Sequence, residues 1–419
     1  MVLEELRLDA SYRKCWRAKG KALEGIFGSD DESYEDLPCY LHVLKEANPG
    51  TVTDIKTEVV EDGRERFLYM FLAFGASIEG FKKLRRVIVV DGTHLNGKYN
   101  GVFLTASGQD ANFQVFPLAF AVVDSENDDA WTWFFEKLER IIADSKSLTI
   151  ISDKCSSIYI AKKRVFPLSH HGSCIVHLAR NVNAKFHSKG LAKLVTNAVF
   201  AYKVTAHWSR AYFQGNHYNM MTSNIAESLN NVLGKGRGCH IVELLKYIRA
   251  MLSWWFSARR KKAGKHRGLT TPKVDKQMQK NVVGVCGSKY DRLKIPCRHS
   301  LLAADTQGIP YGTLVGDCYK TETWRGTYEG IINPEVSDAV IPVEIKNRVL
   351  YPPKARRPAG RPKESRIPSV GEFRVSGHNV YTFVMFRGKK NGVVKTKVNR
   401  CGRCKMTGTN RSSCSNPLP

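Results

Sequence analysis

The feature that most constrains the fold is a succession of apolar runs between residues 85 and 153. Three runs, "RVIVVDG", "GVFLTASGQD" and "VFPLAFAVVDSEN", are followed by the aromatic-rich "DAWTWFFEKLERIIAD" and then by "SLTIISDK". The apolar runs are rich in β-branched residues and bounded by turn residues, which is typical of strands, whereas the aromatic segment has the length of a helix. Three strands, a helix and a fourth strand predict an α/β unit with a partly buried sheet.

Two aspartates follow the first and fourth of these strands. Asp91 ends "RVIVVD" and Asp153 ends "TIISD". If the two strands are neighbours, both carboxylates emerge at one edge of the sheet, where Mg²⁺ or Mn²⁺ could be held by carboxylates and a substrate phosphate. A third acid, Glu227 in the helical "TSNIAESLN", would complete a trio able to activate a water or a hydroxyl for displacement at a phosphodiester. The alternative is that Asp91, followed by Gly92, is a turn former or a helix cap.

The charge balance favours a polyanionic partner. The 419 residues contain 65 Lys and Arg against 39 Asp and Glu, a net charge of +26. Each cation placed on a phosphate releases condensed counterions, so nucleic acid is the first expectation, although a ribosomal or membrane-surface protein would show the same balance. Two basic clusters, "RRKKAGKHR" and "KARRPAGRPKESR", suit phosphate contacts, a nuclear-import signal or a solvated charged face. The candidate DNA contacts in them are Arg259, Arg260, Lys261, Lys262, Arg361 and Lys363.

Other patterns bear on location and on the cysteines. No apolar run approaches the roughly eighteen residues of a membrane span, and the amino terminus lacks a signal-peptide stretch, so we expect a soluble intracellular chain with no membrane partner. Eleven cysteines in a reducing compartment predict metal ligands or core residues rather than a disulfide framework. Cys174 and His177 in "CIVHLARN" are spaced to face one side of a helix, which suits a shared metal or packing near the active site.

The order of these motifs resembles that of the plant Mutator-like (MuDR/MULE) transposases. The segments concerned are "VDGTHLNGKYNGVFLTASGQD", "ISDKCSSI", "HHGSCIVHLARN" and "TSNIAESLNN", and the resemblance extends over nearly the whole chain. It implies an RNase H-like fold and a DDE site for Mg²⁺ or Mn²⁺. It also implies cut-and-paste transposition in the nucleus, with element ends and target DNA as partners and a homo-oligomer as a further one. The family's three acids fall on Asp91, Asp153 and Glu227, and its C-x-x-H pair falls on Cys174 and His177.

The resemblance also identifies departures from the family pattern. The helical insertion after the C-x-x-H helix is shorter by about a helical hairpin. The SWIM-type zinc finger keeps Cys297 and His299, but only Cys286 stands where two cysteines are expected. Closed structural zinc sites take four ligands, so Zn²⁺ binding is expected to be weak or lost.

A terminal zinc knuckle is degenerate in the same way. It keeps Cys401, Cys404 and Cys414, but Thr409 stands where the family pattern expects His. Three thiolates allow partial Zn²⁺ binding but make an ordered knuckle doubtful. Together with the shortened insertion and the incomplete finger, this fits a decayed element copy or an inaccurately spliced gene model.

Five regions are predicted along the chain. They are a helical amino-terminal region (1–80), an RNase H-like DDE domain with a shortened insertion (81–270), a degenerate SWIM-type finger (271–310), a basic Pro-rich linker (311–372) and a tail with the degenerate knuckle (373–419).

Three functions stay open: an active DDE transposase, a domesticated transposase-derived DNA-binding transcriptional regulator without catalysis, and a non-functional remnant. The retained acids favour the first, and the incomplete zinc modules favour the other two. RNA recognition is a further alternative, but no RRM-like or KH-like signature is present.

Overall fold

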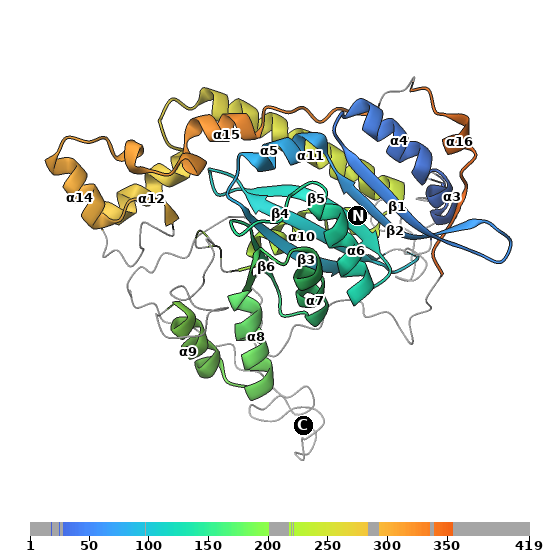
Figure 1. The fold of residues 1–419 in the computed structure, drawn as a ribbon, viewed down its shortest axis with the longest axis horizontal. Coiled ribbons are helices and arrows are strands. Elements are labelled where there is room, and N and C mark those ends of the chain that lie inside the picture. Colours follow the sequence, from blue (N-terminus) through green and yellow to red (C-terminus); the bar gives the residue numbers. More distant parts are fainter. Residues whose placement is uncertain are drawn as a thin grey trace, which may run out of the picture. The chain divides into compact units, whose positions relative to one another are not determined.

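The fold is built on a mixed β-sheet. The computed structural model describes residues 18, 25, 28–96, 98–200, 218, 220, 222–283, 293–335 and 339–354, without the side chains of 198–200. Within these residues the sheet has eight strands (Figure 1). In spatial order they are β1 (Val52–Val59), β2 (Glu65–Ala73), β5 (Val115–Val123), β4 (Val102–Gln109), β3 (Val87–His94), β6 (Thr149–Ser152) and β7 (His170–Ser173), with β8 (Leu350–Tyr351) paired to β2.

Strand β3 carries Asp91 and lies between β4 and β6 in the sheet. It pairs antiparallel with β4, where Asp91 is opposite Thr105, and parallel with β6, where the last pair is Val89 with Ile151. Asp91 and Asp153 each follow that last pair by two residues, so they occupy equivalent positions where the two strands separate. The first and fourth of the predicted strands are therefore neighbours, which is the condition for their two carboxylates to lie at one edge.

Helices cover both faces of the sheet. In Figure 1, α6 (Asp128–Glu139) and α7 (Ser156–Val165) lie in front of it, and α10 (Asn224–Val232) and the long α11 (Ile241–Lys265) lie behind. Alternate residues of β3 point to opposite faces, and Val87 and Val89 pack with Ala226 of α10. Because Asp91 continues this alternation, its side chain lies on the face that α10 covers.

The other helices flank this core. These other helices are α3 (Asp30–Glu35), α4 (Leu37–Ala47), α5 (Gly75–Lys82), α8 (Ile175–Phe186), α9 (Lys189–Phe200), α12 (Pro272–Val283), α14 (Arg298–Thr306), α15 (Thr321–Thr327) and α16 (Val343–Lys346), with short 3₁₀ helices at Gly236–Gly238, Tyr311–Leu314 and Asp317–Tyr319. None of the helices in the described ranges has the length and apolarity to cross a membrane.

The amino-terminal region differs from the prediction of a helical segment over residues 1–80. Its residues 52–73 form the hairpin of β1 and β2, which extends the sheet beyond β5. Strand β2, "ERFLYMFLA", is almost entirely buried. A strand buried on both faces is a continuous apolar run, which periodicity cannot distinguish from a buried helix.

The region after residue 310 also differs from the predicted linker. Up to Lys354, its described residues pack back onto the sheet: β8 pairs with β2, and Trp324 and Tyr328 are fully buried. Both side chains donate to Oδ2 of Asp110, Trp324 Nε1 at 3.2 Å and Tyr328 Oη at 2.9 Å. These contacts join residues more than two hundred positions apart, so no local pattern could have predicted them.

Candidate active site

Three acids gather at one edge of the sheet. Strands β3 and β5 are both antiparallel to β4, so they run in the same direction, and β6 is parallel to β3. Asp91 in β3, Glu126 after β5 and Asp153 after β6 therefore lie at the same edge. Glu126 was not among the sequence-based candidates, although its position shortly after a strand parallel to β3 is a signal that could have found it.

Gly92 leaves room for the Glu126 carboxylate over β3. A Cβ atom at this position would lie 2.6 Å from Oε1 and 2.8 Å from Cδ of Glu126, so any larger residue would displace that carboxylate. Asp91 itself is within the ladder of β3 and β4, which excludes the alternative of a turn former or helix cap. The Asp91–Gly92 pair thus combines a carboxylate on a rigid strand with a glycine whose missing side chain leaves space for the Glu126 carboxylate.

Helix α10 brings in two more polar groups. Nδ2 of Asn230 donates to Oδ2 of Asp91 at 2.8 Å, and Oδ1 of the same amide is buried without a hydrogen-bond partner in the described part of the chain. Glu227, one turn earlier on the same helix, accepts from Nη1 of Arg180 at 3.1 Å. Glu227 thus lies near enough to Asp91 to affect its pKa, and Asn230 and Arg180 are further polar groups here that the sequence did not indicate.

The C-x-x-H pair lies against the base of α10 and is linked to it by Ser223. The Ser223 backbone N–H donates to Sγ of Cys174 at 3.1 Å, and its hydroxyl lies 3.2 Å from the same sulfur, 3.1 Å from Nδ1 of His177 and 3.5 Å from Oε1 of Glu227. Nε2 of His177 is 3.7 Å from the same Glu227 oxygen. The pair thus packs beside Glu227 and is linked to it through fully buried Ser223.

These contacts change the acidity of the pair. Burial opposes ionisation of Cys174, but hydrogen bonds from His177 and Ser223 outweigh it and lower the pKa of the thiol to about 7. The contact with Cys174 in turn raises the pKa of His177, although partial burial opposes this. A hydrogen-bonded thiolate and imidazolium form is therefore accessible near neutral pH.

Negative charge is in excess around Asp91. Burial, together with the nearby Asp153, Glu227 and Glu126, raises its pKa to about 7, and the opposing effect of His177 is smaller than their sum. A group of hard carboxylate oxygens with uncompensated charge fits Mg²⁺ or Mn²⁺ chemically. No three His, Cys, Asp or Glu side chains in the described ranges meet closely enough to hold one ion by themselves. Magnesium, however, is usually held by one or two carboxylates plus phosphate, a role that Asp91 and Asp153 suit.

The basic cluster on α11 divides into two kinds of residue. Arg259 donates to the carbonyl of Val115 and to the Tyr328 hydroxyl, and Arg260 donates to the carbonyls of Tyr328 and Gly330. Lys261 and Lys262 are exposed. The two arginines thus stabilise the fold, and of the four candidates on α11 only the two lysines are exposed enough to contact DNA. The other two candidates, Arg361 and Lys363, lie outside the described residues.

The zinc predictions stay predictions. Cys297 precedes α14 and its Sγ lies 3.3 Å from Oγ of Ser300, a contact that lowers the pKa of the thiol. His299 lies in the first turn of that helix. The remaining proposed ligands lie outside the described residues: Cys286, Cys401, Cys404 and Cys414.

Comparison with known proteins agrees with this geometry. Residues 87–181 match the family model described as MULE transposase domain. This region runs from β3 into α8 and includes Asp91, Asp153 and the C-x-x-H pair, and the mixed sheet is consistent with an RNase H-like MULE core. A curated relative, Protein FAR1-RELATED SEQUENCE 6 of Arabidopsis thaliana, is 24% identical over 118 residues, which is 27% of this chain. The match spans 17% of that relative's length, so the likeness is distant and partial.

Proposed function

We propose that the chain is a Mutator-like transposase that cleaves DNA phosphodiesters and transfers strands at a site formed by Asp91, Asp153 and Glu227. The observation that carries the proposal is the equivalent placement of Asp91 and Asp153 two residues beyond the last pair that joins the parallel strands β3 and β6, with Glu227 on the helix covering that face. Structural carboxylates are normally surrounded by donors, whereas Asp91 lies among other acids. This arrangement suits a cation and a phosphate.

The roles of the individual residues follow from their contacts. When bound, Mg²⁺ or Mn²⁺ would polarise the phosphodiester and the attacking oxygen. Asp91 and Asp153 would hold it, and Asn230 orients the Asp91 carboxylate through its amide. Arg180, with its side chain 47% exposed, is the cation on Glu227 and can turn its guanidinium toward a phosphate oxygen instead.

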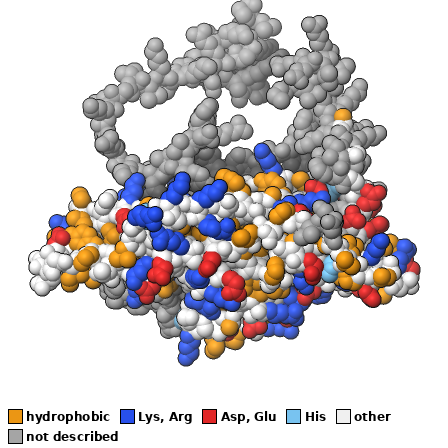
Figure 2. All heavy atoms as spheres, turned by 90° about the horizontal axis from the view of Figure 1, so that it is seen from above, with side chains coloured by type: hydrophobic (Ala, Val, Ile, Leu, Met, Phe, Trp, Pro, Cys, Tyr) orange, Lys and Arg blue, Asp and Glu red, His pale blue; other side chains and the backbone are white. Residues whose placement is uncertain are grey.

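The exposed lysines give DNA a surface to approach. Figure 2 shows Lys and Arg side chains spread over the face seen from above. The exposed cations at and just after the end of α11 and on α12 are Lys261, Lys262, Lys265, Arg267, Lys273, Lys276 and Lys280. We propose these as the phosphate contacts of a nuclear chain that acts on element ends and target DNA, with a second copy of the chain as a further partner.

A domesticated transcriptional regulator is the second candidate. It is compatible with the similarity to a FAR1-related protein, since this likeness fits a transposase or a transposase-derived regulator equally. In that case DNA binding is retained and strand cleavage is absent.

Nicking of supercoiled plasmid by the purified chain separates the candidates. We expect Mg²⁺- or Mn²⁺-dependent nicking in the wild type, reduced at least 100-fold by Asp91→Asn, Asp153→Asn or Glu227→Gln with DNA binding retained. The matched controls are Asp62→Asn at the tip of the β1–β2 hairpin and Glu139→Gln at the end of α6, both solvent-exposed and expected to be active. Nicking that survives in Asp91→Asn would refute the acid assignment. DNA binding without any nicking in the wild type would favour the regulator.

A further inference from the structure

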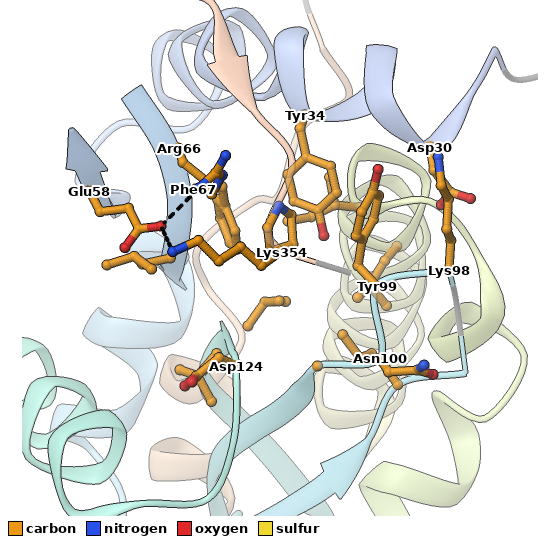
Figure 3. Close-up of a pocket in the computed structure, with 18 of the residues that line it drawn as sticks. Asp30, Tyr34, Glu58, Arg66, Phe67, Lys98, Tyr99, Asn100, Asp124 and Lys354 are labelled. Atoms are coloured by element: carbon orange, nitrogen blue, oxygen red, sulfur yellow. Dashed lines mark hydrogen bonds and ion pairs between the residues drawn. The ribbon is translucent and has the colours of Figure 1, made fainter. Parts of the chain in front are cut away.

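A cavity of about 230 Å³ lies beyond the end of β3 (Figure 3). Its walls come from segments far apart in the chain: α3, the β1–β2 hairpin, the loop between β3 and β4, the end of β5, the start of α11 and the residues after β8. One water molecule occupies about 30 Å³, and pockets for drug-sized ligands span about 300–1,000 Å³. The cavity therefore has room for a single ring system.

The cavity is adjacent to the candidate active site. Asp124, which lines it, precedes Glu126 by two residues, and the Glu126 carboxylate lies over Gly92. Leu95, which also lines it, follows Asp91 by four residues, roughly 13 Å along an extended strand. Successive phosphates of one strand in duplex DNA are about 3.4 Å apart along the axis, so the distance from Asp91 to Leu95 corresponds to roughly four nucleotides. A DNA strand with a phosphate at Asp91 thus has bases within reach of the cavity.

Aromatic side chains form one wall. The ring centroid of Tyr34 lies 5.0 Å from that of Phe67 and 5.4 Å from that of Tyr99. Tyr34 is only 7% exposed, and its hydroxyl points into the cavity in Figure 3. Burial is the largest influence that raises the pKa of the Tyr34 phenol, so the group keeps its proton and can donate a hydrogen bond. The rings are tilted or edge-on to one another, with interplanar angles of 56° and 86°, so the wall offers apolar ring faces and edges together with one hydroxyl.

The charges around the cavity are balanced. Arg66 and Lys354 both pair with Oε1 of Glu58, at 3.3 Å and 3.4 Å, and Lys98 pairs with Asp31 at 2.7 Å. A phosphate subsite needs cations that are available to it, and these three already have carboxylate partners. The cavity is therefore better suited to a neutral ring with hydrogen-bonding groups than to a phosphate.

We propose that this cavity binds one unpaired nucleobase of the DNA strand that occupies the active site. The inference rests on the proposed function, because it requires DNA as the substrate. Extruding a base from a duplex costs unstacking and unpairing energy, and least for a base that is already unpaired. Contact with aromatic rings offsets part of the unstacking energy for any base, and the Tyr34 hydroxyl supplies a hydrogen bond.

Binding of three labelled duplexes to the full chain, at low salt with EDTA to prevent cleavage, tests the proposal. One duplex is fully paired, one carries a single bulged adenine, and one carries a bulged abasic nucleotide of the same length. We expect the bulged adenine to be bound roughly tenfold more tightly than either of the others. The abasic bulge has similar flexibility without a base, so it separates base binding from DNA bending.

Two variants localise the effect. Tyr34→Phe removes only the hydroxyl and should reduce the preference, and Cys239→Trp at the exposed rim should fill the cavity and abolish it, with affinity for paired DNA unchanged. Ala143→Trp, at an exposed position outside the cavity lining, is the matched control and should keep the preference. Equal binding of the adenine and abasic bulges, or a preference that survives Cys239→Trp, overturns the cavity proposal while leaving DNA binding intact. Failure to bind any of the duplexes overturns the proposed function as well.

Discussion

Asp91 and Asp110 are carboxylates of the same sheet in opposite surroundings. Asp110, at the turn between β4 and β5, accepts from the backbone N–H groups of Asn112 and Gln114 and from the side chains of Trp324 and Tyr328. Asp91 accepts one amide hydrogen bond from Asn230 and otherwise lies near other acids. Burial is the largest influence raising the pKa of both groups.

The difference distinguishes a structural carboxylate from a functional one. A buried carboxylate surrounded by donors stabilises the fold, because each donor would otherwise be buried unsatisfied. A carboxylate among other acids opposes folding until a cation or a proton neutralises it. The two sites should therefore respond to substitution in opposite directions, and three measurements can break or sharpen this contrast.

The largest effect is expected at Asp110. Replacing it with alanine leaves four donors without an acceptor and detaches Trp324 and Tyr328, so we expect a loss of about 3–5 kcal/mol in the free energy of unfolding. Chemical denaturation followed by circular dichroism measures this. Asp62→Asn on the exposed hairpin tip is the control and should change stability by less than about 1 kcal/mol. A loss at Asp110 no larger than that of the control would contradict its structural role.

A smaller loss of stability is expected at Arg259, and none at its neighbour Lys261. The Arg259 guanidinium donates to two acceptors and lies 4.4 Å from the Trp255 ring centroid, so Arg259→Ala should cost about 2–3 kcal/mol of stability. Lys261→Ala should leave stability unchanged but reduce the slope of DNA affinity against the logarithm of salt concentration by about 0.9. Denaturation and salt titration of both variants distinguish the roles, and an unchanged slope in Lys261→Ala would remove that lysine from the DNA surface.

The smallest change in stability is expected at Asp91, where substitution should stabilise the protein rather than destabilise it. Its pKa of about 7 in the fold exceeds the value of about 3.9 in an unfolded chain, so the folded state holds the proton more tightly. The metal-free protein should then lose stability as pH rises from about 4 to about 7. Asp91→Asn removes this loss, and we expect a gain of about 1–2 kcal/mol at pH 8 and little change near pH 4.

Denaturation with EDTA at both pH values measures the Asp91 effect. Added Mg²⁺ should stabilise the wild type more than Asp91→Asn, since the amide lacks the charge that holds the ion. A variant that is less stable than the wild type at pH 8 would mean that Asp91 is structural, like Asp110.

Local patterns were sufficient for part of the candidate site. The apolar runs before Asp91 and Asp153, and the helix carrying Glu227 with its polar start and apolar face, were predicted from neighbouring residues alone. The predicted end of the first strand at Asp91 was wrong, because pairing with β4 continues β3 to His94. Glu126, Asn230, Arg180 and Ser223 were missed, because each matters only through a partner that is distant in the sequence.

The sequence by itself determined the strands and helices of the central unit, the acids at their ends and the excess of positive charge, since these depend on the order of side chains along the chain. Only the tertiary structure decided that β1 and β2 extend the sheet, that β8 pairs with β2 while Trp324 and Tyr328 are buried against the core, and that Arg259 and Arg260 face the fold while Lys261 and Lys262 face solvent. The physical reason is that Asp110 and Asp91 differ only in what surrounds them. Trp324 and Tyr328 reach Asp110, and the acids around Asp91 reach that carboxylate, from elements far apart in the sequence, and packing alone brings them together.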